Sequence, residues 1–110
     1  MEEFVKGDVV VLPFPFSDLS KSKKRPALVV ADLQGDDIIL CQITSEARID
    51  NYSIVLSNSD FKKRSLNLTS MVRPNRLFTA DKSIILYKIG SINESKIKEI
   101  EKEIIKIFTK

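Results

Sequence analysis

The chain has 110 residues, of which 43% are hydrophobic and 30% charged, and these proportions are typical of a soluble globular protein with one core. Histidine is missing from the sequence, which excludes serine–histidine and cysteine–histidine catalysis, histidine-pair ribonuclease mechanisms and Cys/His metal sites. The net charge of +3 is mild, so the placement of the charged residues carries more information than their sum.

The single cysteine, Cys41, lies in an apolar, strand-like segment, and the sequence offers no second cysteine for a disulfide. We predict a buried and unreactive thiol, because no histidine is present to activate it. Glu2 and Glu3 stand where a secretory signal would carry basic residues, and no apolar run approaches the ~18 residues that cross a bilayer. These features predict a cytoplasmic protein without membrane contact, with residues 1–110 as one domain.

Short strands are predicted through the first half of the chain. The apolar run at 9–12 is unbroken, and the prolines at 13 and 15 are expected to end it, because proline fits an edge segment but not a central strand. Pro26 is expected to start the next strand, which a Gly/Asp turn at 35–37 joins to a third in an antiparallel hairpin. The predicted strands are residues 9–12, 27–31 and 38–44, with an exposed, basic loop at 17–24 between the first two.

Further short strands and one helix are predicted in the second half. A short helix is expected near Phe61, and Pro74–Asn75 is expected to separate two strands. Apolar residues then recur at steps of three and four, which predicts an amphipathic helix that starts at a capping box of Ser91 and Glu94. Because this helix follows the strands, the pattern predicts a mainly β (α+β) fold: a small, strongly bent sheet or barrel with a C-terminal helix. The strands are residues 53–56, 70–72, 76–79 and 84–89, and the helical apolar residues are Ile97, Ile100, Ile104 and Ile107.

Basic residues cluster in three places along the chain. Clustered positive charge suits a polyanionic ligand, either nucleic acid or an acidic peptide, although each run by itself is more typical of a solvated loop. The clusters are Lys21, Lys23, Lys24 and Arg25, then Lys62, Lys63 and Arg64, and finally Arg73 with Arg76.

Arg25 and Thr44 are the candidates for chemistry. Arg25 is ten residues before Gly35 and Thr44 is nine after it, so a hairpin that turns at Gly35 sets the two roughly opposite each other at its open end. A guanidinium can hold two phosphate oxygens and stabilise the charge of a transition state, and a hydroxyl can bind the same phosphate. RNA brings its own 2′-hydroxyl nucleophile, but the general base is left unassigned, since an arginine is a poor base. From the residues alone, an ion-paired Arg25 and a merely structural Thr44 remain the alternative.

Several segments, in order along nearly the whole chain, resemble the MazF/PemK family of type II toxins. The chain is similar in particular to the branch that carries an FPFSD segment. The most specific element is RPALV joined to ITS, while the other pieces are weaker alone. The segments are GDVVV at 7–11, FPFSDL at 14–19, RPALVV at 25–30, CQITS at 41–45, SMV at 70–72 and KIG at 88–90.

The resemblance implies an SH3-like β-barrel of about five to seven strands with a C-terminal helix, usually as a homodimer. It implies a toxin that cleaves single-stranded RNA, often messenger RNA, without a metal or cofactor, and an acidic antitoxin that occupies the same groove. It assigns catalysis to Arg25 and Thr44. The residues expected to bind RNA are Lys21, Lys23, Lys24, Ser45, Ser70 and Arg73.

Two departures from the family pattern are expected to alter RNA preference or lower activity. Residues 21–24, KSKK, replace the usual loop that is rich in glycine with histidine or glutamate, and Gln42 stands where proline is often found. Because a fold does not determine a function, two alternatives stay open: a non-catalytic barrel that binds RNA, and a barrel that poisons DNA gyrase as the CcdB proteins do.

Overall fold

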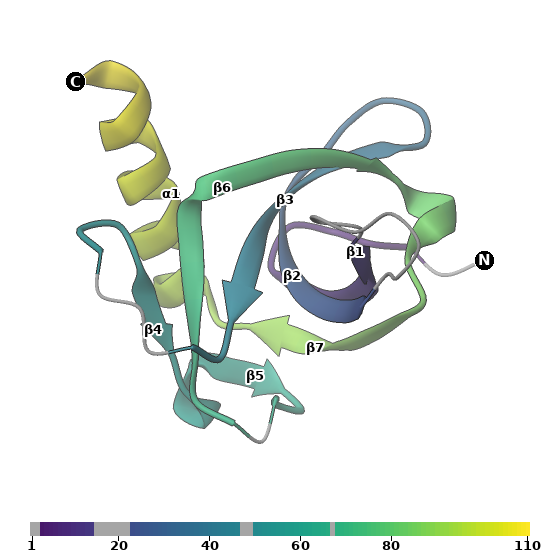
Figure 1. Ribbon diagram of the computed structural model, residues 1–110, viewed down its shortest axis with the longest axis horizontal. Helices are drawn as coiled ribbons and strands as arrows, with labels where there is room; N and C mark the ends of the chain where they lie inside the picture. The colour runs from purple at the N-terminus through teal and green to yellow at the C-terminus, as the bar shows by residue number, and fades with distance from the viewer. Residues whose placement is uncertain (1–2, 15–22, 47–49, 67) are drawn as a thin grey trace.

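The described residues form a seven-stranded antiparallel sheet, curled into a half-barrel, with a helix at the C-terminus (Figure 1). The computed structural model describes residues 3–14, 23–46, 50–66 and 68–110. The strand order is β4-β6-β3-β2-β1-β7-β5, so β4 and β5 are the two edges. The predicted mainly β fold with a terminal helix is confirmed. The elements are β1 (Asp8–Phe14), β2 (Lys23–Asp32), β3 (Asp37–Thr44), β4 (Ile54–Leu56), η1 (Asn58–Asp60), β5 (Phe61–Lys63), β6 (Ser70–Asp81), η2 (Lys82–Ile84), β7 (Tyr87–Ile92) and α1 (Glu94–Thr109).

The central strands bury side chains on both of their faces. In β1, Val10 and Leu12 belong to one buried cluster, while Val9 belongs to a second cluster that includes Ile97 and Ile100 of α1. Burial on both faces explains the unbroken apolar run at 9–12, since a strand with one wet face would alternate polar and apolar residues. The apolar stripe of α1 therefore packs on the sheet, and β1 to β3 form a frame that is fixed from both sides.

Pro13 lies inside β1, although the sequence predicts that it ends this strand. It is opposite Lys24 of β2, whereas the pairing of β1 with β7 extends only to Val11. At Pro13 the strand has a paired neighbour on one side only. The proline nitrogen, which has no hydrogen to donate, can therefore lie on the unpaired side. The expected start of the next strand at Pro26 is also wrong, because pairing with β1 carries β2 back to Lys23.

One bent strand, β6, replaces the two strands predicted on either side of Pro74–Asn75. Its pairing with β3 runs through Cys41 opposite Leu77 and resumes with Gln42 opposite Arg73, so residues 74–76 have no partner in β3. This bulge accommodates the proline, and β6 turns a corner along its length (Figure 1). The predicted strand break is therefore wrong, but the irregularity that proline imposes lies where the sequence places it.

The helix begins at a different cap from the predicted one. The Asn93 side chain accepts a hydrogen bond from the backbone N–H of Lys96 at 2.9 Å and caps α1. Ser91 instead belongs to β7, and its hydroxyl donates to the buried Asp8 carboxylate at 2.9 Å. The capping box fails because strand pairing continues to Ile92, beyond the predicted end of the last strand at residue 89. The short helix expected near Phe61 is confirmed as η1.

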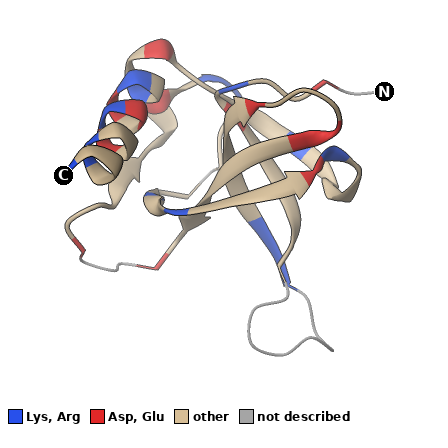
Figure 2. Ribbon diagram, turned by 90° about the horizontal axis from the view of Figure 1, so that it is seen from above, with Lys and Arg blue, Asp and Glu red and all other residues tan. Residues whose placement is uncertain are grey.

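Charges are distributed unevenly over these elements. The surface of α1 mixes acidic and basic residues, whereas the start of β2 is a purely basic stretch on a part of the molecule away from the helix (Figure 2). Within the part of the chain that the structure describes, no helix is long and apolar enough to cross a bilayer.

Cys41 is fully buried in β3, and this burial raises the pKa of its thiol to about 12. Because alkylation requires the thiolate, we expect iodoacetamide at pH 8 to leave the folded protein unlabelled and to label it once urea unfolds the chain. Mass spectrometry before and after unfolding measures this. Rapid labelling of the native protein would contradict the burial of this side chain.

Candidate functional site

The pairing of β2 with β3 brings Arg25 and Thr44 to the same end of the hairpin. The pairing ends with Ala27 opposite Gln42, and Arg25 and Thr44 each lie two residues beyond this pair. The register shifts by one residue between Val29 and Ala31, so β2 holds one more residue than β3 between the turn and this end. That extra residue accounts for the unequal spacing, ten residues before Gly35 and nine after it.

Arg25 and Thr44 lie on the border between two hollows. We call the first the lysine hollow, and its volume is about 320 Å³. Arg25, Ile43 and Thr44 line both this hollow and the second one. Five of the residues expected at the site therefore lie with Arg25 around one depression between the start of β2 and the end of β3. The lysine hollow is lined by Lys23, Lys24, Arg25, Pro26, Ile43, Thr44, Ser45, Leu66, Leu68 and Ser70.

The second depression, the arginine hollow, has a volume of about 300 Å³ and gathers charge from two strands. Arg25 comes from β2, while Arg73 and Arg76 come from the bulged part of β6. Because three residues of β6 are unmatched by β3, both of these arginines reach the hollow beside the end of β3. The arginine hollow is lined by Phe14, Arg25, Gln42, Ile43, Thr44, Glu46, Arg73 and Arg76.

The two hollows together are strongly positive. Among the described residues that line them, five side chains are cationic and one, Glu46, is a carboxylate. An excess of positive charge over a concave surface attracts a polyanion and retains it through contacts to its phosphates. The cations are Lys23, Lys24, Arg25, Arg73 and Arg76.

The hydroxyl groups at the site are held by local hydrogen bonds. Thr44 Oγ1 accepts a hydrogen bond from the backbone N–H of Glu46 at 3.1 Å, which fixes the oxygen while its O–H remains a donor. Ser70 is buried, and its hydroxyl donates to the carbonyl of Leu68 at 3.1 Å. Thr44 therefore has a hydroxyl proton to offer to the hollow, whereas the Ser70 hydroxyl already donates to a carbonyl two residues before it.

Asp50 positions the guanidinium of Arg73. Arg73 Nη2 lies 3.5 Å from Asp50 Oδ2, and Arg73 Nε is buried and makes no hydrogen bond within the described residues. The backbone N–H groups of Tyr52 and Ser53 hold the pKa of Asp50 below its usual value, and the Ser53 hydroxyl and Arg73 act in the same direction. The Asp50 carboxylate is thus stabilised in its ionised form, in which it pairs with Arg73 at the edge of the arginine hollow.

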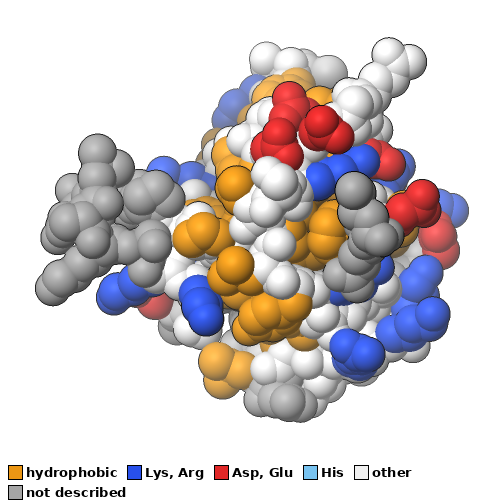
Figure 3. Space-filling model, turned by 90° about the vertical axis from the view of Figure 1, so that its right-hand side faces the viewer, with side chains coloured by type: hydrophobic (Ala, Val, Ile, Leu, Met, Phe, Trp, Pro, Cys, Tyr) orange, Lys and Arg blue, Asp and Glu red, His pale blue; other side chains and the backbone are white. Residues whose placement is uncertain are grey.

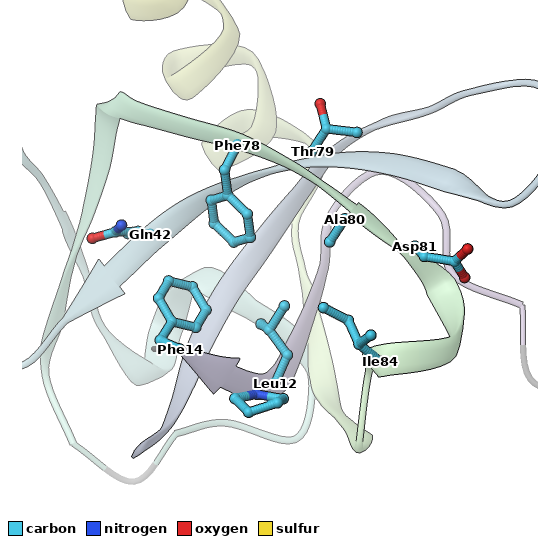
Figure 4. Close-up of a pocket in the computed structure, with 9 residues that line it drawn as sticks. Leu12, Phe14, Gln42, Phe78, Thr79, Ala80, Asp81 and Ile84 are labelled. Atoms are coloured by element: carbon cyan, nitrogen blue, oxygen red, sulfur yellow. The ribbon is translucent and has the colours of Figure 1, made fainter. Parts of the chain in front are cut away.

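A third hollow of about 450 Å³ continues from the arginine hollow, because Phe14 and Gln42 line both. The rings of Phe14 and Phe78 pack edge to face with centroids 4.9 Å apart, and Leu12 and Ile84 point into the same space (Figure 4). Figure 3 shows one face of the molecule, with hydrophobic side chains gathered across its middle and Lys and Arg side chains beside them. Such a lining suits a flat, apolar group such as a nucleobase.

Seven of the eight residues predicted to form the site line the lysine or the arginine hollow. The exception, Lys21, lies outside the described residues. Sequence reasoning missed Glu46 and Phe14, noted Arg76 only as part of a basic cluster with Arg73, and noted Gln42 only as a departure from a family pattern. Glu46 is two residues after Thr44 and could have been found from that spacing, but Phe14 and Arg76 join the site only through strand pairing. The seven residues are Lys23, Lys24, Arg25, Thr44, Ser45, Ser70 and Arg73.

Fold and site together define a small curled-sheet protein with a basic, concave surface of the kind that suits a polyanionic ligand. The chain belongs to the PemK-like, MazF-like toxins of type II toxin-antitoxin systems, because the model of this family matches residues 5–108. No curated protein compared with the chain matches it in sequence.

Solved structures agree with this assignment at the level of the fold. MazF (Form-I) from Deinococcus radiodurans superposes with a TM-score of 0.77 at 18% identity, over 100% of both chains. An endoribonuclease in complex with its cognate antitoxin, from a mycobacterial species, gives a TM-score of 0.77 at 15% identity and covers 96% of this chain and 95% of its own. The Mycobacterium tuberculosis toxin MazF-mt6 gives 0.72 at 16% identity, over 92% and 95%. At these identities the likeness shows a shared fold.

The lowered pKa of Asp50 predicts a pH-dependent contribution to stability. Since the folded-state pKa lies below the unfolded value, the contribution is complete above about pH 4 and is lost as the pH falls through the folded-state value. We expect the difference in free energy of unfolding between the native protein and Asp50→Asn to be largest near neutral pH and to shrink in acid. Urea unfolding followed by circular dichroism at several pH values measures this, with the exposed Asp37→Asn as a control. A difference that stays constant with pH would refute the role of Asp50.

Proposed function

We propose that this toxin is an endoribonuclease that cleaves single-stranded RNA, including messenger RNA, without a metal ion or cofactor. The observation that carries the proposal is the position of Arg25 and Thr44, which together border both basic hollows. A strand of RNA that crosses from one hollow to the other brings a phosphate to this border. The family assignment supports this activity, as do two mycobacterial proteins of the same fold that are described as endoribonucleases.

In the proposed reaction the RNA supplies the nucleophile. The 2′-hydroxyl attacks the adjacent phosphorus, and negative charge builds on the phosphoryl oxygens as the bond to the 5′-oxygen breaks. The Arg25 guanidinium binds two of those oxygens and stabilises the added charge, and it can donate a proton to the leaving oxygen. The Thr44 O–H donates to the same phosphoryl group, because the Glu46 N–H already holds its oxygen. The products are a 2′,3′-cyclic phosphate and a 5′-hydroxyl.

The residues around this pair would bind the neighbouring phosphates and riboses. Lys23 and Lys24 are exposed at the rim of the lysine hollow with Ser45, and Arg73 is in the arginine hollow. Lys21 is assigned to the same role from the family resemblance. Buried Ser70 lines the lysine hollow and would shape its floor.

An acidic antitoxin is the proposed protein partner. Structures of the same fold have been solved with antitoxin, one described as a complex with the cognate antitoxin and two as MazE-MazF from Deinococcus radiodurans. A negatively charged segment would compete with RNA for the positive hollows. We also propose a cytoplasmic homodimer, for which the exposed apolar side chains of Ile105 and Phe108 on α1 offer contact surface.

Arg25→Ala and Thr44→Ala should each lower the rate of RNA cleavage by about 100-fold or more, because each removes a donor to the transition-state phosphoryl group. Thr44→Ser, which keeps the hydroxyl, should retain much of the activity, and Thr44→Val should not. The measurement is cleavage of a single-stranded RNA oligonucleotide in the presence of a chelator, with identification of the product ends.

Arg64→Ala and Thr109→Ala serve as matched controls, since neither residue lines the hollows. Full activity in the Arg25 variant would refute the assignment. Salt-dependent RNA binding without new 5′ ends would instead support a non-catalytic RNA-binding barrel. Inhibition of gyrase without RNA cleavage would support a gyrase poison.

The lysines should contribute through charge rather than chemistry. Replacing both Lys23 and Lys24 by Gln should weaken binding of single-stranded RNA and reduce the slope of log affinity against log salt by about 0.7 for each phosphate that the variant no longer binds. Fluorescence anisotropy at several salt concentrations measures the slope, and Lys98→Gln with Lys102→Gln on α1 is the control pair. An unchanged slope would show that the lysine hollow does not hold phosphates.

A further inference from the structure

We propose that Glu46 is the general base of the cleavage reaction and that its carboxylate accepts the proton of the attacking 2′-hydroxyl. This inference rests on the proposed RNA cleavage and names the catalytic group that the Arg25–Thr44 pair lacks. Attack by a 2′-hydroxyl needs a group that removes its proton, and neither a guanidinium nor a threonine hydroxyl can do so efficiently.

The composition of the site leaves few candidates. The sequence has no histidine, and Cys41 is fully buried in β3 with its thiol protonated. Among the described residues lining the lysine and arginine hollows, Glu46 is the single carboxylate, and the other ionisable groups there are cations. Of these side chains, a carboxylate is the one suited to accept a proton near neutral pH.

The local backbone ties Glu46 to the catalytic pair. The N–H of Glu46 donates to Thr44 Oγ1 at 3.1 Å. The backbone of Glu46 is therefore in direct contact with the hydroxyl that would bind the phosphate. Glu46 is exposed and lines the arginine hollow together with Arg25 and Thr44. A phosphate held by this pair brings its own 2′-hydroxyl into the same space, because the attacking oxygen must lie about 3–3.5 Å from phosphorus.

The charged groups that face Glu46 in this hollow are Arg25 from β2 and Arg73 and Arg76 from β6. They can stabilise the phosphoryl charge while Glu46 removes the proton, so the two tasks fall to different groups. In the step, the proton passes from the 2′-oxygen to the carboxylate, the 2′-oxygen bonds to phosphorus and the bond to the 5′-oxygen breaks. Arg25 donates a proton to that oxygen and regains one from water, and Glu46 returns its proton to solvent, so the reaction balances without any further reactant.

The test compares the native protein with Glu46→Gln and Glu46→Asp in single-turnover cleavage of one RNA oligonucleotide over a range of pH. Glu46→Gln should lower the rate at neutral pH by about 100-fold and abolish the fall in rate that protonation of the base causes in acid. Glu46→Asp, which keeps a carboxylate, should recover part of the rate and the acid limb. Glu94→Gln on α1 is the matched control and should change neither.

Two further measurements separate a base from a binding or structural residue. Affinity for an RNA with a 2′-deoxy nucleotide at the cleavage position should be unchanged or slightly tighter in Glu46→Gln, because the variant loses only a negative charge. A 5′-thio leaving group, which needs no proton, should not restore its rate. Cleavage by Glu46→Gln within about threefold of the native rate, with the acid limb intact, would overturn the assignment of Glu46 but leave the proposed RNA cleavage standing. If the native protein fails to cleave RNA, the proposed function fails, and this assignment with it.

Discussion

The site depends on one constraint, the register in which β2 pairs with β3. Leu28 lies opposite Cys41 and Ala27 opposite Gln42, which brings Arg25 and Thr44 to the same end of the hairpin, and both strands bury side chains on both faces. A shift of one residue would turn every side chain of a strand to the opposite face and expose its apolar residues to water. The core that stabilises the fold therefore also holds the two candidate catalytic side chains in place.

The second contribution comes from the irregularity in β6. A regular antiparallel strand presents alternate residues to one face, so Arg73 and Arg76 would point to opposite sides of the sheet. The unmatched segment at 74–76 breaks this alternation, and both guanidinium groups line one hollow. Pro74 suits this position because an unpaired residue has no ladder hydrogen bond to lose. The pairing of β2 with β3 thus keeps the frame rigid, while the bulge in β6 brings two arginines to one hollow.

A site without histidine must divide its chemistry among simpler groups. In the proposed reaction, Arg25 contributes charge and bidentate geometry, Thr44 contributes an oriented donor, and the Glu46 carboxylate accepts a proton. The hollows that hold these groups continue into an apolar depression between Phe14 and Phe78, so phosphate-binding and base-sized surfaces adjoin each other. This arrangement matches a ligand with alternating charged and aromatic parts, as a nucleic acid strand has.

The sequence by itself determined the strands and the helix that arise from local patterns of apolar residues. The apolar run at 9–12 predicted a strand, and the helical spacing from Ile97 predicted the helix. The near-symmetric distances of Arg25 and Thr44 from Gly35 predicted that these two residues lie at the same end of the hairpin. Tertiary structure decided where pairing stops, since hydrogen bonds to a neighbouring strand carry β1 past Pro13 and β7 past Ser91. It also decided which distant residues share a hollow, because register and bulges join segments whose separation along the chain carries no sign of their contact.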